Sequence, residues 1–385
     1  MMKAVVIAGA RPNFVKIAPL LRALRAEGVT PTLVHTGQHY DWAMSEALFA
    51  DLGIPSPDVN LEVGSGSQGN QIAKVISRFE AWLDEHSADQ VIVVGDVNST
   101  IATTLVAAKR WIPVAHVEAG LRSYDRTMPE EINRLAVDAI ATWLFTPSAD
   151  ADENLLAEGV HPSRIHLVGN IMVDSLLHSL ARAREIPVVD RLGLDRPFGL
   201  VTLHRPALVD NDARLNAVLG ALREIAVDLP LVFPMHPRTR ARLGDAAAMH
   251  ADGRITFIDP VGYLEFLHLE AEASLVLTDS GGVQEETTVL GVPCLTLREN
   301  TERPVTITQG TNRLVGLGPK EIVAAAQSVL ASKGPASLPP LWDGQTAPRV
   351  AAILAAGTPA VSWVPPAIAP LIDKRMTAIE STEPR

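Results

Sequence analysis

The chain has 385 residues, of which 47% are hydrophobic, 20% charged and 4% aromatic, so a disordered or fibrous protein is excluded and a large aliphatic core is expected. The 44 acidic residues outnumber the 33 basic ones and give a net charge of −11, which leaves no overall basic field for nucleic acid or anionic lipid. The single cysteine, Cys294, lies in an apolar run, which excludes an internal disulfide framework and a cysteine zinc site and predicts a buried thiol.

The sequence indicates neither secretion nor membrane insertion. The residues before Gly9 carry too short an apolar stretch for a signal peptide. No apolar run approaches the roughly 20 residues that are needed to cross a bilayer. We therefore expect a cytoplasmic protein with no membrane partner.

Short β-branched runs alternate with amphipathic segments of helical length, which predicts βαβ units and parallel sheets. The apolar residues of segment 14–26 recur at three- and four-residue intervals up to Gly28, which predicts a helix covering one sheet face. In the first half of the chain, the predicted strands are 3–7, 31–35, 90–94, 114–117, 143–145 and 165–168.

The pattern restarts after a predicted helix over 171–184. The strands expected there are 198–203, 231–235, 255–258, 274–277, 292–297 and 313–315. Two doubly wound α/β domains are therefore expected, one over 1–170 and one over 171–358. The Pro-rich tail 359–385 is a candidate to pack back on the first domain.

Polar residues follow many of the predicted strands. In open parallel sheets, ligands bind beyond the carboxyl ends of the strands, so a cleft between two facing domains is the natural site. The clusters concerned are residues 9–11, 95–96, 116–118, 204–205, 236–237 and 279–282.

The segment 279–286 follows an apolar strand and opens a helix, where free backbone N–H groups and the helix dipole favour a phosphate. Its residues Ser280, Gly281 and Gly282 would allow a phosphate to come close to the backbone. Glu286 lies one turn further on the same face, where its oxygens could accept hydrogen bonds from a ribose diol. A simple helix cap with solvated glutamates is the alternative.

Arg11 and Lys16 follow the first strand and could bind a pyrophosphate from the opposite lobe. A solvated surface cation is the alternative for Lys16, and it fits Arg11 less well because Arg11 lies in the turn after the strand. The segment 64–69 matches G-x-G-x-x-G, but its preceding strand is weak and no acidic residue ends a strand about 20 positions later. We interpret it as a flexible loop and expect no nicotinamide cofactor.

Three carboxylates, Asp96, Glu118 and Glu130, are candidates for proton transfer. The first two lie just past apolar strands, where incomplete solvation can tune their pKa values. Structural salt bridges with nearby arginines would explain each one singly, but the three together favour an acid/base site.

Histidines also stand at several predicted strand ends. His204 and His236 adjoin the predicted phosphate site and are functional candidates. His116 and His39 are interpreted as structural, since a lone histidine at a strand end is often a satisfied core residue.

Taken together, these motifs resemble those of the non-hydrolysing UDP-N-acetylglucosamine 2-epimerases over residues 1–356. Many ordered motifs agree at once, whereas any one of them would be weak. They are residues 9–12, 37–39, 95–96, 116–122, 129–134, 204–205, 279–286, 301–304 and 344–345.

The resemblance implies a GT-B arrangement of two Rossmann-like domains facing a central cleft, a homodimer, and chemistry without metal or cofactor. It implies that UDP leaves C1 of the sugar as C2 loses its proton, and that 2-acetamidoglucal is then recaptured as UDP-N-acetylmannosamine. Acid/base positions fall on Asp96, Glu118 and Glu130, and a pyrophosphate histidine on His204. The positions that bind UDP or shape its pocket are Arg11, Lys16, His236, Ser280, Gly281, Gly282, Glu286 and Arg303.

Three other functions stay open at this point. A hydrolysing 2-epimerase shares the elimination but releases UDP and free N-acetylmannosamine. A GT-B glycosyltransferase would need an acceptor pocket and would leave the three carboxylates without an evident purpose. A nucleotide-sugar-binding protein would not need them either.

Overall fold

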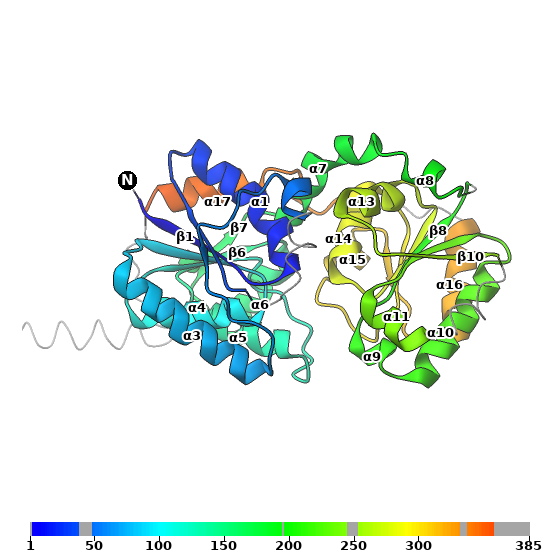
Figure 1. Ribbon diagram of the computed structural model, residues 1–385, viewed down its shortest axis with the longest axis horizontal. Helices are drawn as coiled ribbons and strands as arrows, with labels where there is room; N and C mark the ends of the chain where they lie inside the picture. The colour runs from blue at the N-terminus through cyan, green and yellow to red at the C-terminus, as the bar shows by residue number, and fades with distance from the viewer. Residues whose placement is uncertain (1, 38–47, 195, 245–252, 332–336, 358–385) are drawn as a thin grey trace, which may run out of the picture.

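The computed structural model describes residues 2–37, 48–194, 196–244, 253–331 and 337–357, which form two lobes (Figure 1). Each lobe is built around a parallel sheet, in the order β3-β2-β1-β4-β5-β6-β7 in the N-terminal lobe and β10-β9-β8-β11-β12-β13 in the C-terminal lobe. The N-terminal strands are β1 (Ala4–Ala8), β2 (Thr32–His35), β3 (Val59–Asn60), β4 (Gln90–Val94), β5 (Val114–Val117), β6 (Trp143–Thr146) and β7 (Ile165–Leu167). The C-terminal strands are β8 (Gly199–Thr202), β9 (Leu231–Pro234), β10 (Ile255–Ile258), β11 (Leu275–Thr278), β12 (Cys294–Thr296) and β13 (Asn312–Leu314).

Each sheet has one point at which the strand order reverses. In the first sheet β1 pairs with β4, with Val5 opposite Val91, and in the second β8 pairs with β11, with Leu200 opposite Val276. Crevices at such reversal points are where open α/β sheets bind ligands. The expected α/β fold with two doubly wound, Rossmann-like sheets is confirmed.

Helices cover both faces of each sheet (Figure 1). Those of the N-terminal lobe are α1 (Arg11–Ala26), α3 (Gln68–Glu85), α4 (Asn98–Lys109), α5 (Pro129–Ile140) and α6 (Ala149–Ala157), followed by the short 3-10 helix η1 (Pro162–Arg164). Helix α7 (Ile171–Arg184), which has the predicted bounds, leads into α8 (Val188–Arg191) and the C-terminal lobe. The remaining helices are α9 (Pro206–Val209), α10 (Asp212–Ile225), α11 (Pro237–Leu243), α13 (Tyr263–Glu272), α14 (Gly281–Leu290), α15 (Val305–Thr308), α16 (Pro319–Ala331) and α17 (Thr346–Ala355).

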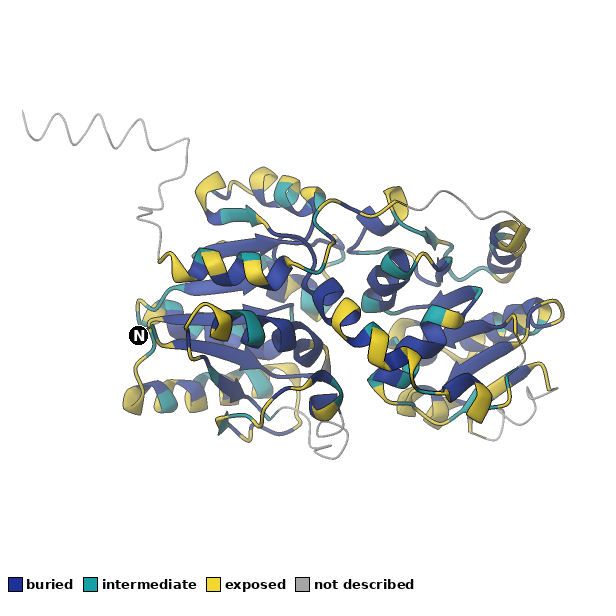
Figure 2. Cartoon of the chain, turned by 90° about the horizontal axis from the view of Figure 1, so that it is seen from above, coloured by how far each residue is buried: buried dark blue, intermediate teal, exposed yellow. Residues whose placement is uncertain are grey.

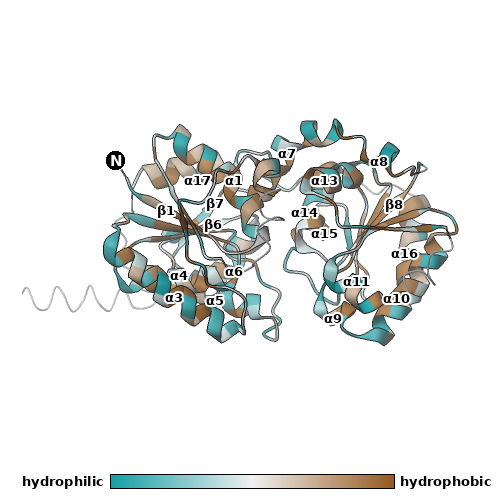
Figure 3. Cartoon of the chain, in the orientation of Figure 1, coloured by the Kyte–Doolittle hydropathy of each residue, from teal (hydrophilic) through white to brown (hydrophobic). Residues whose placement is uncertain are grey.

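The strands between these helical layers are apolar and buried (Figures 2 and 3). All residues of β1, β4, β5 and β6 are buried, as expected for parallel strands that are covered on both faces. Because β-branched runs of this kind are easy to recognise, β4, β5 and β10 have the predicted bounds and most other strands differ by one or two residues. The two-residue strand β3 is not among the predicted strands. Within the described residues, no helix is long and apolar enough to span a membrane.

The last described helix returns to the N-terminal lobe. Ala347, Val350 and Leu354 of α17 join the same buried cluster as Ile17 of α1, and α17 lies beside α1 (Figure 1). The Asp174 carboxylate on α7 holds the start of α17, since it accepts hydrogen bonds from the backbone N–H groups of Thr346 (3.2 Å) and Ala347 (2.8 Å).

This return differs from one expected boundary. The sequence pattern predicts that 171–358 forms the C-terminal domain, with the tail 359–385 as a candidate to pack back, whereas helix α17 at 346–355 already contributes to the N-terminal core. The apolar face of α1 needs a cover, and α17 supplies it. The tail lies outside the described residues, and the division near residue 170 stays a prediction.

Candidate active site

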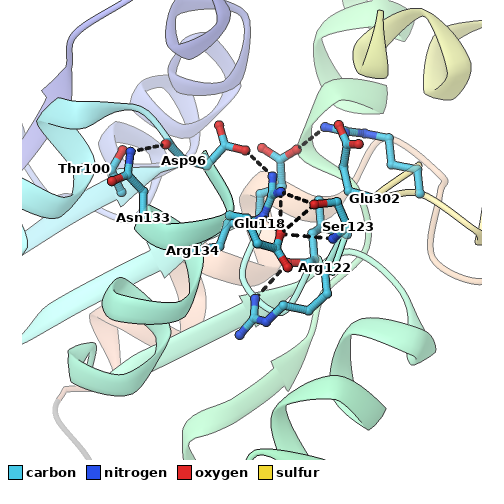
Figure 4. A network of polar contacts seen from close by, with 12 residues as sticks. Asp96, Thr100, Glu118, Arg122, Ser123, Asn133, Arg134 and Glu302 are labelled. Atoms are coloured by element: carbon cyan, nitrogen blue, oxygen red, sulfur yellow. Dashed lines mark hydrogen bonds and ion pairs between the residues drawn. The ribbon is translucent and has the colours of Figure 1, made fainter. Parts of the chain in front are cut away.

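The loop after β4 presents Asp96 at the N-terminal reversal point. Gly95 has φ +64°, a left-handed conformation that turns the chain sharply and favours glycine. Asp96 keeps 30% of its side chain exposed and accepts a hydrogen bond from Arg134 Nη1 at 2.5 Å. Asn133 holds the backbone of Asp96 through a 2.8 Å hydrogen bond from Nδ2 to the carbonyl oxygen (Figure 4). The Asp96 carboxylate is therefore held by Arg134 through one oxygen and remains partly exposed to solvent.

Glu118 follows β5, is buried, and also has a left-handed backbone, with φ +72°. Its Oε2 is ion-paired with the ammonium group of Lys16, and its Oε1 accepts from Arg303 Nη2 at 2.8 Å. Burial alone would raise the pKa of Glu118, but the two cations outweigh it and the pKa is lowered. Because Lys16 belongs to the N-terminal lobe and Arg303 to the C-terminal lobe, Glu118 joins candidate residues of both lobes.

Arg303 lies at the centre of a group of carboxylates. Besides Glu118, its Nη1 contacts Glu302 Oε1 at 2.6 Å and its Nε lies 2.8 Å from Glu285 Oε1. Burial would lower the pKa of Arg303, but these three anions raise it. Burial raises the pKa of Glu285 to about 7, and Arg303 only partly offsets this effect. The sequence motifs point to Arg303, but nothing in their spacing indicates that one guanidinium serves three acids.

Helix α5 begins with two adjacent glutamates that have different environments. The predicted residue, Glu130, is half-buried at the first turn. Glu131 is 1% exposed and accepts hydrogen bonds from the backbone N–H groups of Ser123 (3.0 Å) and Tyr124 (2.9 Å) and from Arg134 Nη2 (2.6 Å). Glu131 therefore holds the loop that follows β5, while Glu130 is the more accessible acid.

His204 and His236 come together at the C-terminal lobe, with ring centroids 5.3 Å apart. The buried Asp279 accepts hydrogen bonds from the backbone N–H groups of His204 (3.0 Å) and Arg205 (2.8 Å). This carboxylate ties the loop after β8 to the loop after β11. His204 consequently lies beside the turn that leads into α14, whose N-cap residue is Ser280.

The two glycines at the start of α14 have different neighbours. A Cβ atom at Gly281 would lie 2.5 Å from Arg303 Nη1, so a side chain there would collide with the guanidinium. At Gly282 the nearest atom would be Met172 Cε at 3.5 Å, which is an ordinary contact. A side chain at Gly281 would therefore displace the Arg303 guanidinium, whereas Gly282 has room for a Cβ atom.

Glu286 is buried and faces helix α13. Its Oε1 accepts a hydrogen bond from the Tyr263 hydroxyl at 3.4 Å. Burial, followed by the charge of Glu285, raises the pKa of Glu286 to about 7. Burial and the neighbouring Glu286 raise the pKa of Glu270 on α13 well above its ordinary value. Glu270 is not among the predicted site residues, and it is one of three glutamates on α13, so the sequence does not single it out.

Two of the predicted residues cannot be placed among these contacts. His39 belongs to the segment 38–47, which lies outside the described residues, and the Arg11 side chain is not described although its backbone begins α1. His116, for which a structural role is predicted, is fully buried. It is bonded to Asp138 and to the loop that carries Asp96.

Comparisons with known proteins agree with this arrangement. A family model described as UDP-N-acetylglucosamine 2-epimerase matches residues 22–355. The UDP-N-acetylglucosamine 2-epimerase of Methanocaldococcus jannaschii is 42% identical over 365 residues, which cover 92% of this chain and 100% of that protein. The UDP-2,3-diacetamido-2,3-dideoxy-D-glucuronate 2-epimerase of Pseudomonas aeruginosa is 40% identical over 358 residues, with coverage of 92% and 99%.

The same fold occurs in a solved structure. The crystal structure of the M. jannaschii enzyme in complex with UDP-GlcNAc and UDP matches with a TM-score of 0.86 over 92% of this chain and 100% of that chain. The expected GT-B arrangement is confirmed. With its family model, its full-length relatives and its paired Rossmann-like lobes in agreement, the chain belongs to the UDP-N-acetylglucosamine 2-epimerase family.

Proposed function

We propose that this enzyme converts UDP-N-acetylglucosamine reversibly into UDP-N-acetylmannosamine by eliminating UDP and adding it back to 2-acetamidoglucal. The observation that carries the proposal is the contact between Glu118 and Arg303 at 2.8 Å, because it brings a candidate base of one lobe beside the candidate UDP site of the other. The M. jannaschii relative, solved with UDP-GlcNAc and UDP, supports the substrate class.

The reaction needs carboxylates near C2 and cations near the leaving group. In the elimination, a carboxylate takes the C2 proton, the C1–O bond breaks, and its electron pair leaves with UDP as the C1–C2 double bond forms. Return of UDP to C1, with a proton delivered to the opposite face of C2, gives the epimer. Asp96, Glu118 and Glu130 are the proposed acids and bases, and preorganised cations and N–H groups stabilise the departing diphosphate.

The proposed UDP contacts come from both lobes. Gly281 and Gly282 offer backbone N–H groups at the start of α14, a helix of 10 residues, where the dipole favours an anion. The Ser280 N–H donates to Thr278 Oγ1 at 2.9 Å, so Ser280 would contribute its hydroxyl. Glu286 accepts from the ribose hydroxyls. His204 and His236 border the diphosphate, and Arg11, Lys16 and Arg303 supply positive charge.

Proton NMR in deuterated water tests the reaction. With UDP-N-acetylglucosamine, we expect a new UDP-linked anomeric signal and deuterium at C2. Free N-acetylmannosamine together with UDP would establish the hydrolysing alternative instead. UDP binding without any turnover would overturn the epimerase proposal in favour of a glycosyltransferase or a binding protein.

The identity of the sugar needs a separate test, because a 40% identical relative is named as a 2-epimerase of UDP-2,3-diacetamido-2,3-dideoxy-D-glucuronate. Parallel assays with that UDP-sugar and with UDP-N-acetylglucosamine measure the ratio of their kcat/KM values. We expect UDP-N-acetylglucosamine to be the better substrate, and the reverse ratio would move the assignment to the second sugar.

Asp96→Asn is the cleanest test of the acid/base assignment. It removes one ion pair, to Arg134, whereas Glu118→Gln disturbs contacts with two cations. Both variants should lose turnover while UDP affinity, measured by calorimetry, stays within a few-fold of the wild type. Turnover that persisted in both would show that these acids do not carry the proton transfer.

Gly282→Ala tests the phosphate site. A Cβ atom there would meet only Met172 Cε, at 3.5 Å, so a loss of UDP affinity would report blocked phosphate approach rather than a damaged fold. We expect at least a tenfold weaker affinity with an unchanged melting temperature. Unchanged affinity would place the phosphate elsewhere.

The family resemblance also leads us to propose a homodimer. Light scattering on the purified enzyme should give twice the 41.2 kDa mass of the chain.

A further inference from the structure

The backbone turn that carries Asp96 is held at three successive carbonyl oxygens by side chains from different elements. Asn13 Nδ2 on α1 donates to Val94 O at 2.9 Å, and Asn133 Nδ2 on α5 donates to Asp96 O at 2.8 Å. Between them, His116 Nε2 on β5 lies 2.9 Å from Gly95 O. A carbonyl oxygen only accepts hydrogen bonds, so Nε2 of His116 is the donor in this contact.

The other nitrogen of the His116 ring contacts a buried acid. Nδ1 lies 2.6 Å from Asp138 Oδ1, and both side chains are at most 1% exposed. Burial would raise the pKa of Asp138, but His116 and Arg122 outweigh it and lower the pKa. Asp138 is therefore a carboxylate anchored inside the lobe.

Asp138 also holds the loop that carries Glu118. Its Oδ2 accepts hydrogen bonds from the backbone N–H of Gly120 at 3.0 Å and from Arg122 Nη1 at 2.8 Å. A Cβ atom at Gly120 would lie 2.5 Å from the carbonyl oxygen of Ala151, so this loop is tightly confined on its other side. Figure 4 shows Asp96, Glu118 and Arg122 around the same region.

We propose that Asp138 and His116 are positioning residues that set the place of Asp96 relative to Glu118. One oxygen of Asp138 fixes the loop of Glu118, and the other, through His116, fixes the carbonyl that precedes Asp96. This inference rests on the proposed function, in which Asp96 and Glu118 exchange protons with the sugar. His116 itself is fully buried within β5, so we assign it a positioning role rather than a catalytic one.

Replacing His116 or Asp138 should therefore slow the reaction without weakening UDP binding. Removal of a residue that orients a reacting group lowers the rate by roughly 10- to 100-fold, because small displacements break the reactive alignment. Most of the proposed UDP contacts lie on the C-terminal lobe, and the two from the N-terminal lobe, Arg11 and Lys16, belong to α1. UDP affinity should therefore change little when His116 is replaced.

The test is a steady-state comparison of His116→Phe with the wild type, using UDP-N-acetylglucosamine. We expect kcat to fall 10- to 100-fold, while KM and the dissociation constant for UDP stay within threefold. Asp138→Asn, which has nearly the same shape, is a second variant that should show the same separation if His116→Phe does not fold.

His268→Phe is the matched control. His268 is also buried, and its Nδ1 contacts the carbonyl oxygen of Ala183 at 3.0 Å, but it lies on α13 of the C-terminal lobe. We expect it to lower the melting temperature without changing kcat by more than twofold.

Two results would overturn the inference alone. A folded His116→Phe or Asp138→Asn variant with kcat within twofold of an active wild type would remove the positioning role. A parallel loss of kcat and UDP affinity would show a merely structural role. A wild-type enzyme without turnover would overturn the proposed function and this inference with it.

Discussion

Arg303→Lys tests whether the fork-shaped guanidinium is required at the junction of the lobes. Arg303 contacts Glu118, Glu285 and Glu302 at 2.6 to 2.8 Å, and a single ammonium group cannot reproduce three such contacts. Glu118 keeps its lysine partner, and Glu302 keeps Arg298 at 2.8 Å. Among the described residues Glu285 has no other ion pair, so we expect the lost stabilisation to come mainly from this acid.

The expected cost depends on pH. At pH 6 Glu285 is mostly protonated, so we expect only the contacts with the other two acids to be lost, at a cost of about 1 kcal/mol of unfolding free energy. Between pH 6 and pH 8 Glu285 loses its proton beside Arg303 but keeps it when Arg303 is absent, which adds about 1.4 kcal/mol to the loss at pH 8.

Urea-induced unfolding followed by circular dichroism at pH 6 and pH 8 measures both values. Arg313→Lys is the control, because this half-buried arginine bonds only to the Ser328 hydroxyl (3.1 Å) among the contacts described. A change below about 0.5 kcal/mol is expected there. A loss at pH 8 below about 1 kcal/mol, or equal losses at both pH values, would refute the reasoning.

Two further predictions concern Glu286 and Gly95. In the folded state the pKa of Glu286 is about 7, against 4.5 in the unfolded chain, so the folded state keeps a proton that the unfolded chain releases. The contribution of Glu286 to the free energy of unfolding therefore falls as pH rises from 4.5 to 7. Glu286→Gln should make that fall shallower by up to about 1 kcal/mol per pH unit in urea titrations at pH 5, 6 and 7, and an unchanged slope would contradict it. Gly95→Ala would place a Cβ atom 2.9 Å from Lys16 Nζ at a residue with φ +64°, so we expect at least a tenfold lower kcat. Gly53→Ala is the control: Gly53 has φ +65° but no neighbouring atom near its Cβ position, so this variant should lose about 1 kcal/mol of stability and keep its kcat.

Sequence patterns can predict where the candidate site residues gather. Buried parallel strands are recognisable runs, and their carboxyl ends meet at one sheet edge, so the pattern alone assigns Asp96, Glu118 and His204 to strand ends. The motif at the start of α14 follows the same logic. These assignments need only local periodicity and the rule for parallel sheets.

Contacts between distant segments cannot be predicted in this way. Glu118 and Arg303 are 185 positions apart, and their ion pair depends on how the two lobes face each other. Which of the two adjacent acids, Glu130 or Glu131, is buried and which stays accessible depends on the direction in which α5 begins. In the sequence His116 resembles a lone core histidine, because its partner Asp138 lies 22 positions away on a helix whose buried face is polar.

The return of α17 also determines the order in which the molecule can be completed during synthesis. The N-terminal sheet leaves the ribosome first, but Val350 and Leu354, which seal its core against α1, are among the last described residues to emerge. The N-terminal lobe is thus the first to be synthesised and the last to be completed. Until α17 is synthesised, the face of α1 that α17 covers stays exposed. A ribosome-bound chain that stops before residue 346 should therefore be open to proteases and chaperones at α1, even when its C-terminal lobe is already folded.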